Sequence, residues 1–214
     1  MYKRQSLDRA AKISSVPIVN AGNGNGEHPT QALLDIYTIH TELQNRSISI
    51  HDTFPIIVTF IGDLKNSRTI HSLIQILSHF QCMQFYYLCP EGLEMPTEIY
   101  NEMNEKGFQQ QYISRLDEIL DKSDIFYFTR IQKERIDNLD LKSEYNDIQP
   151  YSITMKEVNQ MKSSSIIMHP FPRLDEIHFG VDFDKRAVYY KQIDNGVYMR
   201  MTILHEILNN SSFQ

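Results

Sequence analysis

Five short strand-like runs recur along the 214-residue chain and are separated by stretches with helical spacing. The runs are Ile56–Ile61, Gln84–Leu88, Gln110–Ile113, Ile125–Phe128 and Ile166–Met168. Near-continuous apolar runs such as the first are typical of strands buried on both faces of a parallel sheet. Strands that alternate with helices form right-handed βαβ units. The order of these segments therefore predicts an α/β fold, a Rossmann-like parallel sheet with helices on both faces.

Helices are expected between the strands and near both ends of the chain, where apolar residues recur at helical spacing. They are Pro29 to about Leu43, Thr69–Phe80, Pro96–Lys106, a short helix with a capping-box-like start at Ser114, and Val197–Asn210. The first and the last lie outside the strand–helix repeat, which suggests that they pack on something other than the sheet.

The composition excludes several classes of protein. The formal charge is −6, from 21 Lys+Arg and 27 Asp+Glu, and a nucleic-acid or anionic-membrane surface normally shows a basic excess. No apolar stretch approaches the roughly 18 residues that a membrane-spanning helix needs. The histidines show no metal-ligand spacing, so we expect no metal site. Cys82 and Cys89 are interpreted as small buried side chains in a reducing cytoplasm, with a disulfide or metal pair as the alternative.

Three of the apolar runs are each followed by a loop that carries a cationic residue. With their flanking residues, these runs are Pro55–Ile61, Asp124–Phe128 and Ser165–Met168. The loops are Gly62-Asp63-Leu64-Lys65-Asn66-Ser67-Arg68-Thr69, Thr129-Arg130-Ile131-Gln132 and His169-Pro170-Phe171-Pro172-Arg173. Ligands of open α/β sheets bind outside the carboxyl ends of the strands, and the arginine fork donates two parallel hydrogen bonds to a carboxylate or phosphate. The loops therefore predict a site for a small anion with two charges, with surface ion pairing as the plainer alternative.

A second feature is the glycine-rich loop before the first helix. Gly22, Gly24 and Gly26 lack the spacing of a dinucleotide fingerprint, and no acidic residue follows at the required distance. Pro29 suits the first position of a helix, which places His28 at the cap and Gln31 one turn inside. A helix N-terminus favours anions, so both side chains could present donors to one anion or carbonyl.

With their order and spacing, these segments resemble the catalytic chain of the aspartate carbamoyltransferase family from about Asn20 to Asn210. The matching motifs are Asn20-Ala21-Gly22, His28-Pro29-Thr30-Gln31, Gly62-Asp63-Leu64-Lys65 with Arg68-Thr69, Thr129-Arg130-Ile131-Gln132-Lys133-Glu134-Arg135, His169-Pro170-Phe171-Pro172-Arg173 with Asp175-Glu176-Ile177, and Asn195-Gly196 ahead of Arg200. The sister ornithine enzymes typically carry cysteine in place of Thr30 and His-Cys-Leu-Pro at the later site, and this chain has neither.

The resemblance implies transfer of a carbamoyl group from carbamoyl phosphate to L-aspartate, an early reaction of pyrimidine biosynthesis, without metal, cofactor or covalent intermediate. It implies a cytoplasmic enzyme that forms a homotrimer in its full length, with a regulatory chain as a further partner in some members. It also assigns the site. The implied site residues are His28 and Gln31 as catalytic contacts to the carbamoyl group, the backbone of Phe171 and Pro172 at its amide, and Arg68, Arg130 and Gln132 at the aspartate.

Two local departures from the family pattern stand out. Phe171 occupies a position where the family usually has leucine, and the backbone role assigned there should tolerate this. The segment Asp137–Lys142 lengthens the loop before Glu144 and Tyr145, which leaves domain-closure contacts by these two residues open.

The larger departure is an absence, because family members begin with a whole carbamoyl-phosphate domain. We therefore expect residues 1–28 to be a remnant of that domain, 29–196 to be the aspartate-binding domain with its interdomain helix, and 197–214 to be a helix that packs back on the missing domain. Residues 1–5 match what a common transposon sequencing adapter encodes, so we expect an N-terminal truncation with these residues as an artefact. Two other interpretations stay open: a carbamoyltransferase for another amino acid, and a non-catalytic amino-acid-binding relative.

Overall fold

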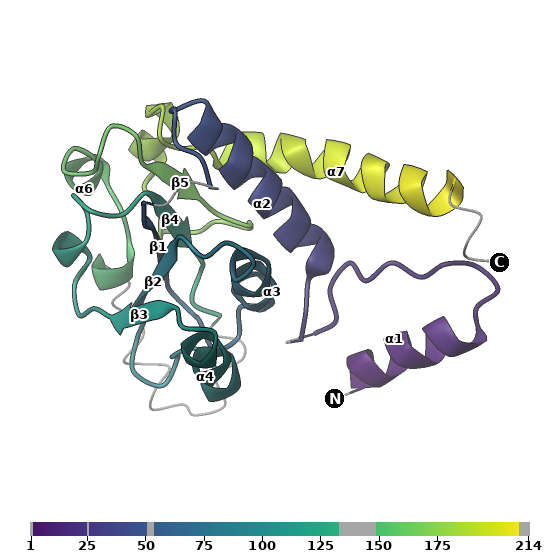
Figure 1. The fold of residues 1–214 in the computed structure, drawn as a ribbon. Coiled ribbons are helices and arrows are strands. Elements are labelled where there is room, and N and C mark those ends of the chain that lie inside the picture. The colour runs from purple at the N-terminus through teal and green to yellow at the C-terminus, as the bar shows by residue number, and fades with distance from the viewer. Residues whose placement is uncertain (1, 25, 51–53, 133–148, 210–214) are drawn as a thin grey trace.

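Five parallel strands form the centre of the computed structural model, which describes residues 2–24, 26–50, 54–132 and 149–209 (Figure 1). In sheet order they are β3 (Gln109–Tyr112), β2 (Met83–Leu88), β1 (Ile56–Ile61), β4 (Ile125–Phe128) and β5 (Ile166–Met168). Every neighbouring pair is parallel, so the predicted fold is confirmed. Three strands have the predicted bounds; β2 begins one residue earlier, and β3 is shifted by one residue towards the N-terminus.

Alternate residues of the strands point into two separate cores, one on each face of the sheet. Phe60 and Tyr127 belong to one core, and Ile61 and Phe126 belong to the other. Both faces of the sheet are therefore buried, which is why the strands are continuous apolar runs in the sequence. The first face is covered by α2 (Pro29–Gln44), α3 (Arg68–Leu77) and α4 (Thr97–Glu105), and the second by η1 (Leu116–Glu118), η3 (Gln149–Tyr151), α6 (Met155–Val158) and η4 (Phe179–Phe183).

The strand order reverses between β1 and β4, where the site lies. β2 and β3 are added on one side of β1, and β4 and β5 are added on the other. Ile61 and Phe128, the last residues of β1 and β4, are in register. Gly62 follows β1 with φ +111°, and a Cβ there would lie 2.1 Å from the carbonyl oxygen of Thr129. The segments that follow β1 and β4 can therefore approach this closely only with glycine at this position. Such a reversal point is where open α/β sheets bind ligands.

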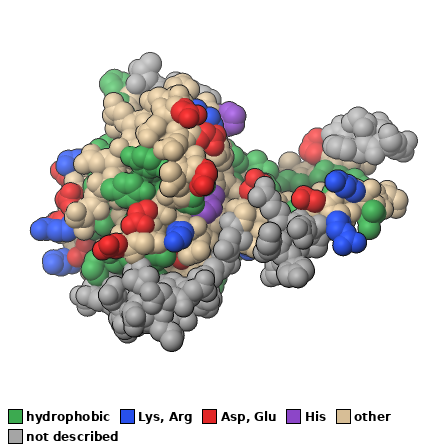
Figure 2. All heavy atoms as spheres, turned by 90° about the horizontal axis from the view of Figure 1, so that it is seen from below, with side chains coloured by type: hydrophobic (Ala, Val, Ile, Leu, Met, Phe, Trp, Pro, Cys, Tyr) green, Lys and Arg blue, Asp and Glu red, His purple; other side chains and the backbone are tan. Residues whose placement is uncertain are grey.

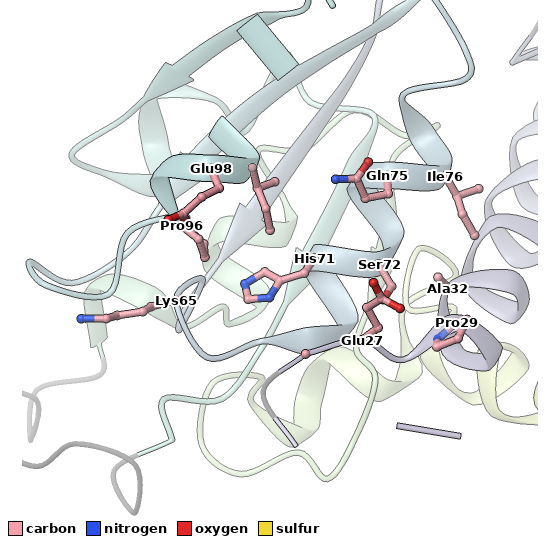
Figure 3. Close-up of a pocket in the computed structure, with 12 residues that line it drawn as sticks. Glu27, Pro29, Ala32, Lys65, His71, Ser72, Gln75, Ile76, Pro96 and Glu98 are labelled. Atoms are coloured by element: carbon pink, nitrogen blue, oxygen red, sulfur yellow. The ribbon is translucent and has the colours of Figure 1, made fainter. Parts of the chain in front are cut away.

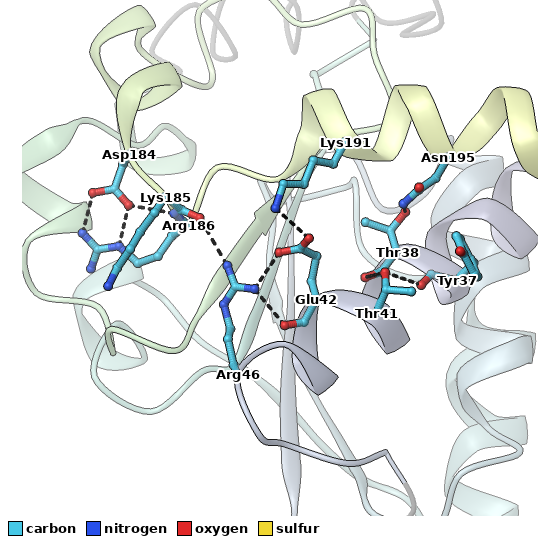
Figure 4. Close-up of polar contacts among 10 residues, drawn as sticks. All are labelled: Tyr37, Thr38, Thr41, Glu42, Arg46, Asp184, Lys185, Arg186, Lys191 and Asn195. Atoms are coloured by element: carbon cyan, nitrogen blue, oxygen red, sulfur yellow. Dashed lines mark hydrogen bonds and ion pairs between the residues drawn. The ribbon is translucent and has the colours of Figure 1, made fainter.

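The long helix α7 (Tyr189–Asn209) packs on α2 and then extends away from the sheet (Figure 1). Its predicted start at Val197 was wrong by eight residues, since the helix already begins at Tyr189. Gly196 lies inside α7 without interrupting it. It is where α7 meets α2, and a Cβ at this position would lie 3.3 Å from Leu34 Cδ2. Figure 4 shows the polar contacts beside this crossing: Lys191 pairs with Glu42 at 2.9 Å.

The N-terminal helix α1 (Tyr2–Ile13) lies apart from the α/β layers in Figure 1 and was not predicted from the sequence. The expected boundary between residues 196 and 197 falls inside α7, which runs through it without a break. The boundary at residues 28 and 29 coincides with the start of α2. The division into three parts stays a prediction.

Candidate active site

A cavity of about 210 Å³ lies where β1, β4 and β5 end and α2 and α3 begin. It brings together every residue that the sequence predicted for the site, and no Asp or Glu is among the described residues that line it. The predicted members are His28, Gln31, Arg68, Arg130, Gln132, Phe171 and Pro172. Residues that lie in the three predicted loops but were given no individual role also line it: Asn66, Ser67, Thr69, Thr129, His169 and Pro170. Two guanidinium groups, with no carboxylate among the lining residues that the structure describes, make the cavity suited to an anion.

Arg68 is held by the loop that precedes α2. One of its guanidinium nitrogens donates to the carbonyl oxygen of Gly24 at 3.2 Å. Gly22, at φ +113°, lies so close that a Cβ would be 2.8 Å from the Arg68 Cζ. The side chain of Asn20 stabilises this turn by accepting from the Gly22 amide at 2.9 Å. The Asn-Ala-Gly motif therefore serves to place Arg68.

Arg130 and Gln132 follow β4, and their loop is tied to the loop that follows β1. The Gln132 side chain donates to the carbonyl oxygen of Asn66 at 3.2 Å, and its backbone amide donates to Asp63 at 3.3 Å. Asp63, which is fully buried, also accepts from the Asn66 amide at 2.9 Å. One carboxylate thus holds both loops, a role that its place in a sequence motif did not reveal.

His28 stands at the N-terminus of α2, which begins at Pro29 as predicted. The backbone amide of Gln31 donates to the His28 carbonyl oxygen at 3.0 Å. The side chain of Gln31 is therefore the part of this residue that can contact a ligand. Burial lowers the pKa of His28 to about 4, and the nearby charges of Arg68 and Arg200 act in the same direction. The imidazole is therefore neutral near pH 7, and it can donate a hydrogen bond without carrying a charge.

The loop after β5 is shaped by the buried ring of His169. Its Nδ1 accepts from the Phe171 amide at 2.9 Å, so the proton is on Nε2, which donates to Glu176 at 2.7 Å. Phe171 adopts φ +56°, and the bond to Pro172 is cis. These contacts hold the Pro-Phe-Pro segment against the cavity, where its carbonyl groups are the available acceptors.

A larger cavity of about 650 Å³ lies between α2, α3 and α4 (Figure 3). Among its lining residues are one cation, Lys65, and two acids, Glu27 and Glu98. The ring of His71 is engaged by the Leu64 carbonyl oxygen at 2.7 Å. This mixture of charges does not suit an anion with two negative charges, and we place the site in the smaller cavity.

Some predicted features fall outside the described residues. They are Lys133, Glu134 and Arg135 of the second loop motif, the segment Asp137–Lys142, and Glu144 and Tyr145. Within the described part of the chain, no cluster of three or more His, Cys, Asp or Glu could hold a metal ion. The helices of that part are all too short or too polar to cross a membrane.

The chain matches known protein families over most of its length. Residues 55–207 match the family described as aspartate/ornithine carbamoyltransferase, Asp/Orn binding domain. Residues 1–41 match the family described as aspartate/ornithine carbamoyltransferase, carbamoyl-P binding domain. The first match includes both arginine loops and the Pro-Phe-Pro segment.

Individual relatives agree with this match. The chain is 40% identical over 214 residues to an aspartate carbamoyltransferase catalytic subunit of Vibrio cholerae, covering 97% of this chain and 66% of the relative. The catalytic subunit of M. jannaschii aspartate transcarbamoylase superposes with a TM-score of 0.84 at 37% identity, covering 97% of this chain and 64% of that one. Aspartate transcarbamoylase from Trypanosoma cruzi in complex with N-(phosphonacetyl)-L-aspartic acid gives a TM-score of 0.80 at 38% identity, covering 96% and 62%. The chain thus spans about two thirds of the length of these relatives.

Proposed function

Because the chain belongs to the aspartate carbamoyltransferase catalytic subunit family, we propose that it supplies the aspartate-binding side of an enzyme that converts carbamoyl phosphate and L-aspartate into N-carbamoyl-L-aspartate and phosphate. The observation that carries the proposal is the cavity at the β1–β4 reversal, which gathers Arg68 and Arg130 with His28. L-Aspartate carries two carboxylates, and each can be bound by one guanidinium fork.

The reaction follows from the polarity of these groups. The aspartate amine attacks the carbamoyl carbon, the new N–C bond forms, and the C–O bond to phosphate breaks with the electron pair leaving on phosphate. The amine gives up a proton to the departing phosphate or to water. A neutral His28 donates to the carbamoyl oxygen as negative charge develops there, while Gln31 and the carbonyl groups of Phe171 and Pro172 hold the carbamoyl NH2. Gln132 lies beside Arg130 and orients the aspartate.

The remaining features of the proposal concern the whole enzyme. This chain offers one wall for the phosphate, whose charge needs further cations and amides. We propose that these come from the part of the relatives that the chain does not span, and that the complete enzyme is a cytoplasmic homotrimer. A regulatory chain stays a further possibility for its partners.

The test uses a completed enzyme, in which this chain is fused behind the N-terminal third of the Vibrio cholerae relative. Purified, folded protein should form carbamoyl aspartate from carbamoyl phosphate and aspartate, and the N-terminal third alone should not. Ornithine, asparagine and glutamate serve as competing amino acids in the same assay.

Each outcome separates the proposal from its rivals. A preference for another amino acid would identify a different carbamoyltransferase. A folded, completed enzyme that binds aspartate and forms no product with any amino acid would support a non-catalytic binding relative instead.

A further inference from the structure

Asp35 is a fully buried carboxylate on α2 that does not line the cavity, yet it is bonded to a residue that does. Its Oδ1 accepts from Gln31 Nε2 at 2.9 Å and from Gln192 Nε2 at 2.6 Å. Its Oδ2 accepts from the Tyr127 hydroxyl at 2.6 Å. Burial raises the pKa of Asp35 to about 7, against the effect of these three hydrogen bonds and of Arg200. Burying a carboxylate lowers the stability of the fold unless hydrogen bonds compensate, so a buried carboxylate with three donors is a candidate for a functional role.

The first contact fixes the orientation of Gln31. An amide side chain has one donor end and one acceptor end. Because Nε2 of Gln31 is bonded to Asp35, the oxygen is the end left to the cavity that Gln31 lines. An acceptor there suits the NH2 of a carbamoyl group and does not suit its oxygen, so the donor that the sequence led us to expect from Gln31 is instead bonded to Asp35.

The second contact reaches the opposite wall of the cavity through Gln192 of α7. While Nε2 of Gln192 donates to Asp35, its oxygen accepts from the His169 backbone amide at 3.0 Å. His169 begins the Pro-Phe-Pro segment, and its ring accepts from the Phe171 amide. A continuous set of hydrogen bonds therefore connects Asp35 to the backbone around Phe171.

We propose that Asp35 is a positioning residue for carbamoyl transfer: its carboxylate aims the Gln31 oxygen into the cavity and, through Gln192 and His169, sets the Phe171–Pro172 carbonyl groups that face the same NH2. The inference rests on the proposed function, since it assigns these acceptors to a carbamoyl amide. It predicts that a change at Asp35 acts on carbamoyl phosphate and turnover, and leaves the arginines that bind aspartate in place.

The kinetic test uses Asp35→Asn in the completed enzyme. An asparagine presents an NH2 to at least one of three donors, so the set of hydrogen bonds must rearrange. We expect kcat/KM for carbamoyl phosphate to fall by about tenfold to a hundredfold, the effect of losing a hydrogen bond to a charged group. KM for aspartate at saturating carbamoyl phosphate should change by less than about threefold. A fall of less than about twofold for carbamoyl phosphate, or equal effects on both substrates, would overturn the proposal.

Matched variants separate positioning from stability. Asp124→Asn makes the same change at a buried aspartate that is bonded to Lys162 and the Ile57 amide, away from the cavity, and it should leave both KM values unchanged. If Asp35→Asn does not fold, Tyr127→Phe deletes the hydroxyl that donates to Asp35 and that also contacts Thr69 and Gln192, and it keeps the ring in the core. It should act in the same direction by about two- to fivefold, whereas Tyr87→Phe, which deletes a hydroxyl bonded to Gln110, should not.

A spectroscopic arm is independent of catalysis and uses the 214-residue chain with Leu204→Gln and Leu208→Gln, which replace exposed leucines of α7 to limit association. With glutamine side chains labelled with 15N, Asp35→Asn should shift the amide signals of Gln31 and Gln192 and leave that of Gln160 in place. Unmoved signals from Gln31 and Gln192 would overturn the proposal even if the completed enzyme is active. If the completed enzyme is inactive while these signals move, the proposed function fails and the hydrogen-bonded arrangement stands without its role.

Discussion

Arg130 follows β4 and shares one cavity with Arg68, which follows the neighbouring strand β1. In the completed enzyme we expect Arg130→Ala to raise KM for aspartate and lower turnover, with kcat/KM falling about a hundredfold, or roughly 3 kcal/mol, for a lost bidentate pair. Arg130→Lys should also be impaired, because a point charge cannot reproduce the planar fork. Steady-state kinetics with aspartate as the varied substrate measures both effects.

The control for this prediction is Arg115→Ala, which removes an exposed arginine that pairs with Asp117 on the second face of the sheet. It should leave the kinetic constants unchanged. Kinetics of Arg130→Lys that match the unmodified enzyme would show that the cavity does not bind a carboxylate through this fork.

His28 gives the second prediction at this scale, because its protonation state decides how it can act. Its pKa is lowered to about 4, first by burial and then by Arg68 and Arg200. The folded state therefore binds fewer protons than the unfolded state between about pH 4 and 6.5, and the stability that His28 contributes is lost as pH falls through this range. NMR titration of the imidazole should give a midpoint near the lowered value.

Two substitutions test the stated causes. Arg68→Met should raise the pKa of His28 only part of the way, since burial is the larger cause, and Lys65→Met should leave it unchanged. His28→Ala in the completed enzyme should lower turnover more than aspartate binding, because its donor faces the carbonyl oxygen. A midpoint at the ordinary histidine value would show that burial and the two arginines do not lower the pKa of this imidazole.

The residues found from the sequence share one property, which is a position just after a strand or at a helix start. That position alone predicts a shared edge of the sheet for Arg68 and Arg130. Asp35 has no such local signal, because its partner Tyr127 is 92 residues away and its contact with Gln31 looks like any pair one helical turn apart. Side chains that act through tertiary contacts are therefore the part of the site that a single sequence leaves undetected.

At the scale of elements, the strands were predictable because burial on both faces leaves little but apolar residues in them. β3 is an edge strand and the most exposed of the five, and its polar sequence made its bounds harder to place. The start of α7 was missed because Asn195 and Gly196 resemble a helix end. Tertiary contacts with α2 override that local signal: Asn195 donates to Thr38 at 2.9 Å, and Gly196 allows the two helices to approach.

Two glycines at positive φ allow a matched test of the β1–β4 reversal. At Gly62, φ is +111° and a Cβ would lie 2.1 Å from the backbone of Thr129, whereas at Gly107 φ is +83° and no atom lies within 4 Å. Gly107→Ala should therefore cost only the left-handed conformation, about 1–2 kcal/mol. Gly62→Ala should cost distinctly more, on the order of 3 kcal/mol or above, because β1 and β4 must separate.

Denaturant unfolding of both variants, in the 214-residue chain with Leu204→Gln and Leu208→Gln to limit association, measures this difference. A separation of β1 and β4 would also widen the space between Arg68 and Arg130, so aspartate binding in the completed enzyme should weaken for Gly62→Ala and not for Gly107→Ala. Equal losses of stability for the two variants would show that the backbone at the reversal relaxes without strain.

At the scale of the whole molecule, the described surface carries apolar side chains along the outer half of α7. Exposed fractions there reach 62% at Met201, 53% at Leu204 and 78% at Leu208, while Ile207 is half-buried. Figure 2 shows this end of the molecule from below, with α1 on the viewer's side and hydrophobic side chains visible among charged ones. On α2, Leu33 and Tyr37 are also exposed. We propose that this surface packs against the part of the relatives that this chain does not span.

The last prediction is that the 214-residue chain, expressed as given, associates in solution and forms no carbamoyl aspartate. Each large apolar side chain left in water forgoes about 1.5–3 kcal/mol, against a total stability of roughly 5–15 kcal/mol, and exposed patches of this kind drive association. Light scattering after size exclusion should show aggregates, and Leu204→Gln with Leu208→Gln should raise the monomer fraction. Leu174→Gln, at a leucine that is 60% exposed away from α7, should not. A monomeric chain that made product above the uncatalysed rate would show that the site is complete without further cations for the phosphate.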